Sequence, residues 1–173
     1  VTILFGDSNK LFTESILLHQ GMPTIAGDND PNDRFGSRTT FGDFNGDGLD
    51  DLVITAPQKD VNGIENVGMM WVLPGLPQGM GIINSAKSFD LSMFIAEDAI
   101  SPEDRWGEMI ASGDFNGDGY EDIAISSPNV NTCDDDTDIL IEYLYGPSNQ
   151  MCEKENAGLV VILYCLLYTS DAA

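Results

Sequence analysis

The sequence predicts an all-β protein built from a repeated four-stranded antiparallel unit, and three observations support this prediction. Apolar runs of strand length recur along the chain, helical periodicity is nearly absent, and several motifs return at a fixed spacing of 71 residues. An apolar run without helical gaps is typical of a strand that is buried on both faces. Self-similarity at a fixed period is typical of an architecture in which each unit packs on its neighbours.

The repeat is visible when the chain is compared with itself after a shift of 71 residues. Asp-Arg-Phe-Gly at 33–36 then aligns with Asp-Arg-Trp-Gly at 104–107, and Ala-Pro at 56–57 aligns with Ser-Pro at 127–128. A further apolar run occurs three times, at residues 1–6, 68–75 and 158–164. These runs are expected to be equivalent strands of successive units.

Each unit contains four strand candidates, which we name A to D in chain order. We expect strand A at 35–41 and 106–112, strand B at 52–56 and 123–127, strand C at 69–73 and 159–164, and strand D at about 89–95. In the preceding unit, the equivalent of strand D is expected at 23–26. Residues 11–19 have a pattern that also allows one or two turns of amphipathic helix.

Four antiparallel strands repeated at a fixed period predict the blades of a β-propeller, a fold that closes into a ring with short, protected edges. Closure takes at least about four blades, so we expect the native protein to continue beyond both ends of this chain. Such a fragment exposes two inter-blade faces. The expected divisions are the end of a preceding blade at 1–30, a complete blade at 31–100, and a second, truncated blade at 101–164 with an inserted loop at 129–157.

The last nine residues, 165–173, resemble a translated sequencing adapter and are left out of the fold prediction. Cys165 falls where the preceding repeat has Gly75, which supports a non-native origin of this tail. Cys133 and Cys152 remain, and in a secreted protein such a pair more often forms a disulfide than a metal site. We expect the inserted loop to form its own hairpin, with this disulfide as its constraint.

The most specific motif is an acidic loop of nine residues between strands A and B, which occurs at 43–51 and again at 114–122. Side-chain oxygens recur at every second position, and the seventh position offers its backbone carbonyl. Ca²⁺ takes about six to eight oxygen ligands, and a loop around it must turn sharply midway, where a glycine is suited. We predict two calcium sites, with the ligands Asp43, Asn45, Asp47, Leu49 and Asp51 in the first loop and Asp114, Asn116, Asp118, Tyr120 and Asp122 in the second.

Two alternatives to this interpretation are an EF-hand and a bare turn. An EF-hand needs a bidentate Glu at the twelfth position and flanking helices, whereas Ile54 and Ile125 stand at that position here, inside predicted strands. A bare turn of Asn, Gly and Asp has no use for oxygens at alternate positions as far as Asp51. Strict alternation where the loop enters strand B predicts that Asp50 and Glu121 turn outward.

Charge and composition restrict the function further. The net charge is −22, with 29 acidic and 7 basic residues, which argues against binding to nucleic acid or to an anionic membrane surface. No apolar run approaches the roughly 18 residues of a membrane span. An acidic chain with calcium loops suits the outside of a cell, so we expect a secreted or cell-surface protein.

The sequence offers little support for catalysis within this chain. His19 is the only histidine, and its neighbours Leu17 and Leu18 favour a packing role over that of a general base. Common hydrolase motifs are absent from the sequence. The acids of the two loops are assigned to metal, so no catalytic or cofactor-binding residue other than the calcium ligands is predicted.

The motifs on either side of the first acidic loop resemble those of a known family. Phe35 and Gly36 before the first acidic loop, and Ala56 and Pro57 after strand B, resemble the FG-GAP repeat of integrin α-subunit propellers. The main departures are Trp106 in place of the Phe and a residue other than Gly before Ala-Pro; neither removes a calcium ligand. The resemblance implies a seven-bladed extracellular propeller with its calcium loops on one face and its remaining blades elsewhere in the same chain.

The resemblance leaves two functions open. One is an integrin-α-like adhesion or ligand-binding module, whose protein or glycan ligand is expected on the face opposite the calcium loops. The other is the non-catalytic propeller of a secreted hydrolase that resembles glycosylphosphatidylinositol-specific phospholipase D. The inserted loop at 129–157 has 29 residues where the complete blade has ten at 58–67, and it is interpreted either as a recognition loop or as a solvated loop without function.

Overall fold

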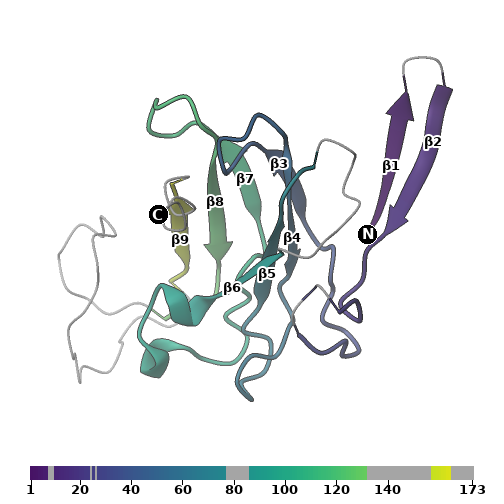
Figure 1. Cartoon of the computed structure of the whole chain (residues 1–173). Coiled ribbons are helices and arrows are strands. Elements are labelled where there is room, and N and C mark those ends of the chain that lie inside the picture. Colours follow the sequence, from purple (N-terminus) through teal and green to yellow (C-terminus); the bar gives the residue numbers. More distant parts are fainter. Residues whose placement is uncertain (8–9, 24, 26, 77–85, 132–156, 165–173) are drawn as a thin grey trace, which may run out of the picture.

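The computed structural model describes residues 1–7, 10–23, 25, 27–76, 86–131 and 157–164. Over these residues the protein is all-β, as predicted, and three antiparallel sheets stand side by side (Figure 1). The only helices in these ranges are two single turns of 3₁₀ helix, η1 (Leu91–Met93) and η2 (Glu97–Ala99). Neither is long and apolar enough to cross a membrane.

The strands follow the repeat. They are β1 (Thr2–Asp7), β2 (Lys10–Leu17), β3 (Thr39–Gly42), β4 (Asp51–Ala56), β5 (Met69–Leu73), β6 (Lys87–Asp90), β7 (Ile110–Gly113), β8 (Asp122–Ser127) and β9 (Leu159–Leu163). The first sheet pairs β1 with β2, the second has the order β3-β4-β5-β6, and the third has the order β7-β8-β9. All neighbouring strands are antiparallel.

The predictions of strands B and C are confirmed within one residue by β4, β5, β8 and β9. Strand A begins later than predicted, because the chain turns tightly just before it. Arg34 and Gly36 have φ values of 60° and 87°, a left-handed conformation that a strand cannot contain. Arg105 and Gly107 repeat this turn, with φ values of 56° and 86°.

The prediction of strand D is wrong in part. Strand β6 ends at Asp90, whose carboxylate accepts a hydrogen bond from the Ser92 backbone N–H (2.9 Å) and so caps η1. The strand prediction for 23–26 is also wrong, because the partner of β1 is β2 and the described residues Pro23 and Ile25 lie outside any strand. Residues 10–17 form a strand, so the helical alternative for 11–19 is excluded.

Strands β4 and β5 are buried on both faces, as their unbroken apolar sequences predict. Leu52, Ile54 and Trp71 pack in a cluster with the first sheet. Their neighbours Val53 and Met70 point the other way, into a second cluster shared with the third sheet. Alternation along each strand thus supplies one side chain to each interface in turn.

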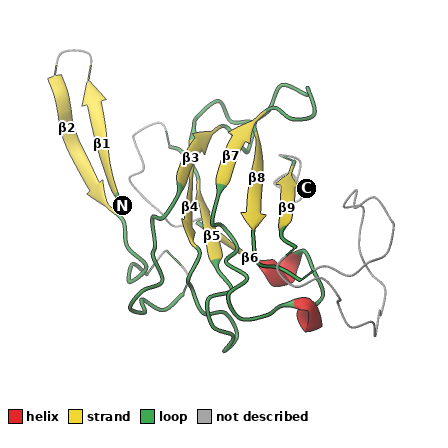
Figure 2. Cartoon of the chain, turned by 180° about the vertical axis from the view of Figure 1, so that it is seen from behind, coloured by secondary structure: helices red, strands yellow, loops and turns green. Residues whose placement is uncertain are grey.

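The second and third sheets meet with their first strands, β3 and β7, side by side (Figure 2). Thr40 Oγ1 and Ser112 Oγ share a hydrogen bond of 2.8 Å, and Ser112 Oγ also donates to the Phe41 carbonyl (3.2 Å). The Trp106 backbone packs directly against Gly68. Trp106 N also donates a hydrogen bond to the Val67 carbonyl at 2.7 Å. Sheets packed face to face with their first strands adjacent are successive blades of a β-propeller, so the fold prediction is confirmed.

The outer faces of the first and third sheets carry exposed apolar side chains. Val160 and Ile162 on β9 are 61% and 39% exposed, whereas their equivalents in the second sheet, Met70 and Val72, are buried. Leu4 on β1 is likewise exposed. These are the two uncovered inter-blade faces that the repeat predicts for the isolated chain.

A buried ion pair lies at the end of the second sheet where β4 ends. Lys59 is 4% exposed, and its Nζ donates to Asp33 Oδ2 (3.0 Å), Asp30 Oδ2 (3.2 Å) and the Asp28 carbonyl (2.8 Å). Burial by itself would lower the pKa of Lys59, but the hydrogen bonds that Lys59 donates to Asp33 and Asp30, together with the charges of these acids, outweigh it and raise that pKa above 10.5. The ammonium therefore stays charged inside the protein.

The third sheet keeps the acid of this pair but lacks the lysine. Asp104, the equivalent of Asp33, is fully buried, and Val130 stands where the preceding repeat has Lys59. Asp104 Oδ2 accepts a hydrogen bond from Ser101 N (2.8 Å), whereas Oδ1 has no hydrogen-bond partner in the part of the chain that the structure describes. Burial raises the pKa of this carboxyl, and the Ser101 N–H lowers it by less.

Asp104 is expected to make stability fall as the pH rises. The folded protein holds this proton more tightly than the unfolded chain, so its contribution is complete below the ordinary pKa of 3.8 and is lost as the pH rises through the folded-state pKa. Asp104→Asn should flatten this dependence, and Val130→Lys, which offers an ammonium, should reverse it. Urea unfolding between about pH 4 and pH 7 measures the slopes; equal slopes for wild type and Asp104→Asn would contradict the prediction.

Candidate metal centre

The two acidic loops connect β3 to β4 and β7 to β8, at the same end of neighbouring sheets (Figure 1). Each loop is closed by a pair of facing residues, Gly42 with Asp51 in the first hairpin and Gly113 with Asp122 in the second. A strand follows each loop directly, beginning at Asp51 and at Asp122. The EF-hand alternative, which needs a helix there, is therefore excluded.

In the first loop the polar side chains turn inward and accept hydrogen bonds from the loop backbone. Asp43 Oδ1 accepts from Gly46 N (2.8 Å) and Asp47 N (3.1 Å), and Asp43 Oδ2 accepts from Gly48 N (2.8 Å). Asn45 Oδ1 accepts from Asp47 N at 2.8 Å, and Asp47 Oδ1 accepts from the N–H of the seventh residue at 2.9 Å. These bonds wind the backbone around the side chains of the first, third and fifth positions.

The second loop repeats this pattern. Asp114 Oδ1 accepts from Gly117 N (2.7 Å) and Asp118 N (3.1 Å), and Asp114 Oδ2 accepts from Gly119 N (3.0 Å). Asn116 Oδ1 accepts from Asp118 N (2.9 Å), and Asp118 Oδ1 accepts from the seventh residue's N–H (2.9 Å). The predicted equivalence of the two loops is therefore confirmed. Positive φ values at the fourth and sixth residues, all glycine, make the winding possible: Gly46 77°, Gly48 83°, Gly117 79° and Gly119 93°.

Asp51 closes the first loop from a buried position. It is 1% exposed, its Oδ2 accepts from Phe44 N (3.2 Å), and its Oδ1 accepts from Gly75 N (2.8 Å) and Asn45 Nδ2 (3.2 Å). All three donors are neutral N–H groups. The Gly75 donor comes from the end of β5 and was not predicted from the sequence, because nothing in the local pattern places that strand beside the loop.

Burial raises the pKa of Asp51 to about 6, against the hydrogen bonds from the Gly75 and Phe44 N–H groups that lower it. The carboxylates of Asp47 and Asp43 raise this pKa further. Three of the predicted ligands of the first loop therefore carry like charges that act on one another. Asp122 has the same place in the second loop: it is fully buried and accepts from Phe115 N at 3.0 Å.

Asp50 and Glu121, which directly precede the buried acids Asp51 and Asp122, differ in their exposure to solvent. Asp50 is exposed, as predicted. Glu121 is partly exposed, but its Oε2 is shielded from solvent and lies against Gly42 of the preceding hairpin. The sequence could not show this contact, since it depends on how closely two blades approach.

The donor set of each loop fits a hard cation. It consists of three carboxylates, one amide oxygen and one backbone carbonyl, which is the oxygen chemistry that Ca²⁺ selects. Among the described residues, no group of three or more His, Cys, Asp or Glu side chains is gathered as it would be around an ion, because the loop carboxylates are turned toward backbone N–H groups. The structure therefore confirms the loop and its acids, while their use as ligands stays a prediction.

The opposite end of the blades carries the connections from strand B to strand C. After β8 ends at Ser127, the chain continues to Val130, and the far end of the inserted loop is at Gly158, whose N–H donates to the Val130 carbonyl at 3.0 Å. Cys133, Cys152 and most of the predicted loop at 129–157 lie outside the described residues, as does the tail at 165–173. The predicted disulfide and hairpin therefore stay predictions.

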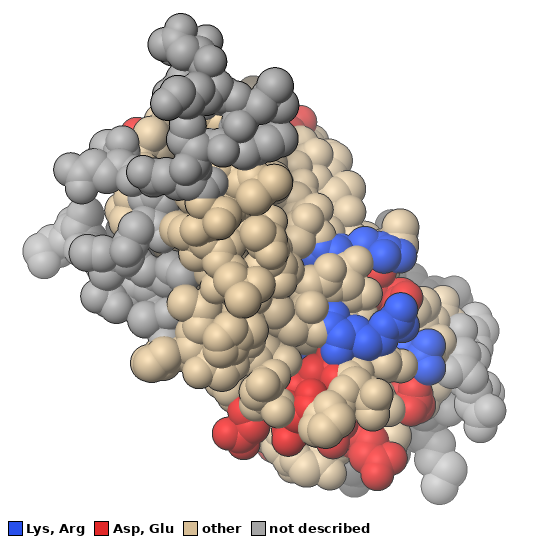
Figure 3. Space-filling view, turned by 90° about the vertical axis from the view of Figure 1, so that its right-hand side faces the viewer, with Lys and Arg blue, Asp and Glu red and all other residues tan. Residues whose placement is uncertain are grey.

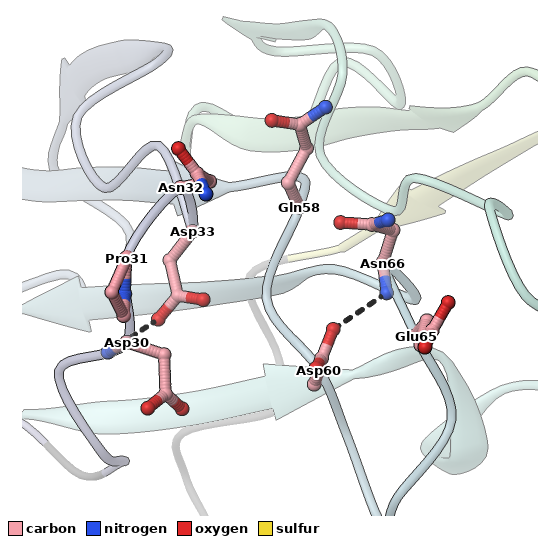
Figure 4. Close-up of a pocket in the computed structure, with 8 residues that line it drawn as sticks. All are labelled: Asp30, Pro31, Asn32, Asp33, Gln58, Asp60, Glu65 and Asn66. Carbon is pink, nitrogen blue, oxygen red and sulfur yellow. Dashed lines mark hydrogen bonds between the residues drawn. The ribbon is translucent and has the colours of Figure 1, made fainter.

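A polar pocket of about 440 Å³ opens at this end of the second sheet (Figure 4). It is lined by Asp30, Pro31, Asn32, Asp33, Gln58, Asp60, Glu65 and Asn66. Asp60 Oδ1 accepts a hydrogen bond from the Asn66 backbone N–H (2.9 Å), and Asp33 Oδ2 accepts one from Asp30 N (3.3 Å). Acidic side chains gather on this part of the surface with basic side chains beside them (Figure 3).

The sequence matches a known protein family over two segments. The FG-GAP repeat matches residues 35–73 and 106–163, more than half of the chain. The chain belongs to the FG-GAP repeat family. The first FG-GAP match spans β3 to β5 and the second spans β7 to β9, so each contains one acidic loop and the two strands that hold it.

Individual relatives cover parts of the same region. Integrin alpha-4 of Xenopus laevis is 38% identical over 95 residues, 54% of this chain and 8% of that protein. Phosphatidylinositol-glycan-specific phospholipase D of Mus musculus is 33% identical over 100 residues, 58% of this chain and 12% of that protein. Integrin alpha-PS5 of Drosophila melanogaster is 32% identical over 95 residues, again 8% of that protein. This FG-GAP chain thus spans about a tenth of the length of the curated relatives it matches.

Proposed function

We propose that this FG-GAP chain is a calcium-binding segment of an extracellular β-propeller and that it serves as an adhesion or ligand-binding module. The observation that carries the proposal is the same winding of two nine-residue loops around an Asp, an Asn and an Asp, with a third acid buried at the start of the strand that follows each loop. Three carboxylates within nine residues, one of them buried, are costly to keep charged unless a cation neutralises them. The loops therefore have a physical need for a divalent cation.

The ten predicted ligand residues would hold two calcium ions, one in each loop. When bound, Ca²⁺ supplies the positive charge that the carboxylates lack. The residues of the chain supply the rest: the loop backbone orients the first, third and fifth side chains, and β4 and β8 fix the ninth in the sheet. Calcium is therefore proposed to stabilise the blades rather than to act in a reaction.

Calcium titration of the protein tests this proposal. Isothermal titration calorimetry is expected to show two bound Ca²⁺ per chain, and chelation should lower the melting temperature because the carboxylates then repel one another. Extracellular calcium modules bind with Kd values of about 10⁻⁴ to 10⁻³ M, so millimolar calcium is the relevant range. Binding of no calcium, or melting curves that are the same with calcium and with EDTA, would contradict the proposal.

The ligand-binding role rests on the integrin relatives and on the end of the blades opposite the metal loops. We propose that residues 31–100 and 101–164 are successive blades of a propeller that continues in the same chain. Its protein or glycan ligand would meet the connections from strand B to strand C, including the insertion at 129–157. Deleting residues 134–151 should weaken ligand binding and leave both calcium sites intact; unchanged ligand binding would remove the recognition role of the insertion.

A second candidate function is the non-catalytic propeller of a secreted hydrolase. It is favoured by the 33% identity to phosphatidylinositol-glycan-specific phospholipase D, which extends over 58% of this chain. The two candidates differ outside the chain. A full-length coding sequence with clustered His and Asp zinc ligands upstream would favour the hydrolase, whereas a transmembrane span downstream would favour an adhesion receptor.

A further inference from the structure

Two consecutive residues of the second loop reach across to the first. The ring of Tyr120 covers Gly46: a Cβ added there would lie 3.0 Å from Tyr120 Cε1 and 3.5 Å from Cδ1. The next residue, Glu121, fills the space into which a Cβ of Gly42 would point. A side chain at 42 or 46 would therefore have to displace Glu121 or the Tyr120 ring, and the φ of 77° at Gly46 also favours glycine.

Both glycines adjoin the proposed calcium ligands of the first loop. Gly42 immediately precedes Asp43, and Gly46 lies between the third and fifth positions and donates its N–H to Asp43 Oδ1 at 2.8 Å. The Tyr120 ring therefore holds the segment of backbone that orients the Asp43 carboxylate. Displacing the ring would release this segment from one side.

Tyr120 belongs to the proposed ligand set of the second loop, and Glu121 adjoins it. Tyr120 N donates to Asp118 Oδ1 (2.9 Å), and the Tyr120 carbonyl is the proposed seventh-position ligand. Glu121 directly precedes the buried Asp122. The hydrogen bonds of Ser112 to Thr40 and to the Phe41 carbonyl hold the two hairpins side by side. A movement of the second loop is therefore expected to move the first loop as well.

We propose that Tyr120 and Glu121 are positioning residues that couple the two calcium sites: filling the second loop orders them and thereby strengthens calcium binding by the first. The inference rests on the proposed calcium function. Linkage makes the coupling reciprocal, so calcium in the first loop strengthens binding by the second to the same degree. Filling one of two coupled sites typically changes the affinity of the other by about 5- to 150-fold. Because this contact is one ring against one backbone segment, we expect a change of about 5-fold.

Glu121 adds charge to this contact. Its Oε2 is shielded from solvent and has no hydrogen-bond partner among the described residues. A carboxylate in that position beside Gly42 attracts a cation bound at Asp43 and is costly while the first site is empty. Glu121→Gln, which keeps the shape and removes the charge, should therefore weaken the first site more than the second.

Single-site variants measure the coupling. Asp47→Asn leaves only the second site and Asp118→Asn only the first, and each amide keeps the oxygen that accepts the backbone N–H at positions 49 and 120. Calorimetric calcium titration of the protein is expected to show tighter binding than the sum of the two single-site isotherms. The first site should bind about 5-fold more weakly in Asp118→Asn than in the protein with the second site filled.

The Tyr120 ring is tested separately from its carbonyl. Tyr120→Ala keeps the backbone ligand and should reduce the isotherm to the sum of independent sites. Tyr120→Phe should keep the coupling, because the ring carbons make the contact with Gly46. Phe115→Ala is the matched control: Phe115 lies in the same loop and is 48% exposed, as Tyr120 is, but its ring lies against Gly113 of its own blade. It should leave the coupling unchanged.

The outcomes separate this inference from the calcium proposal. A protein that binds no calcium overturns both. Two bound ions whose isotherm equals the single-site sum overturn the coupling and leave the calcium sites in place. If Tyr120→Ala does not fold, Glu121→Gln and Tyr120→Phe decide: first-site affinity unchanged by Glu121→Gln, or coupling lost in Tyr120→Phe, contradicts the roles assigned to these residues.

Discussion

Replacing Asp47 and Asp118 together by alanine is expected to abolish calcium binding and to remove the calcium-dependent part of thermal stability. A ligand at 100 times its Kd stabilises the folded protein by about 2.7 kcal/mol, so the loss approaches twice that value when both sites are saturated. The effect is large because each loop loses one of its three predicted carboxylate ligands. Differential scanning calorimetry with calcium and with EDTA measures it.

The charge effect can be separated from the loss of hydrogen bonds. Asp47→Asn with Asp118→Asn keeps the oxygens that accept the backbone bonds at 2.9 Å but removes the Asp47 charge, which adds to the effect of burial in raising the pKa of Asp51. In EDTA this variant should be at least as stable as the wild type, whereas in calcium it should be less stable. Asp50→Ala is the control, because Asp50 is exposed and outside the predicted ligand set. A calcium effect that survives the double variant would assign the metal to other residues.

Replacing Lys59 by methionine is expected to cost about 3–5 kcal/mol of stability, the usual cost of breaking a buried ion pair. Asp33 is 3% exposed and would lose the ammonium that lies 3.0 Å from its Oδ2. The raised pKa of Lys59 keeps its contribution complete below pH 10.5 and loses it only above that value. Urea unfolding at neutral pH therefore measures the full effect.

Removing both charges tests the cause of this cost. Lys59→Met with Asp33→Asn should recover much of the lost stability, because no unpaired charge then stays buried. Lys87→Met is the matched control on an exposed lysine of β6. If the double variant is as unstable as Lys59→Met alone, the effect comes from packing of the lysine stem and the ion pair contributes little.

The two charge arrangements also distinguish the blades. In the second sheet, the buried acid at the start of the repeat is paired with Lys59, whereas the third sheet has Val130 at the repeat position of that lysine. Sequence similarity between the repeats is therefore compatible with different pH behaviour. The second blade keeps the contribution of Lys59 until this ammonium loses its proton at high pH, and the third loses stability when Asp104 ionises.

The sequence by itself determined the repeat, the strands on either side of each acidic loop, and the inward side chains of those loops. Strand β5 was predictable because burial on both faces requires an apolar run, β4 because its residues are mostly apolar and β-branched, and the loops because polar side chains recur at alternate positions. Both are local patterns, set by the spacing of a few neighbouring residues.

Tertiary structure decided what depends on contact between distant segments. The late start of β3 follows from the left-handed turn at Arg34 and Gly36, and the loss of the predicted strand after Asp90 follows from the capping of η1. The ion pair of Lys59 with Asp33 joins two different strand connections. The contact of the Tyr120 ring with Gly46 joins two different sheets. Such contacts are set by the angle and separation of packed sheets, which the order of residues along one strand does not contain.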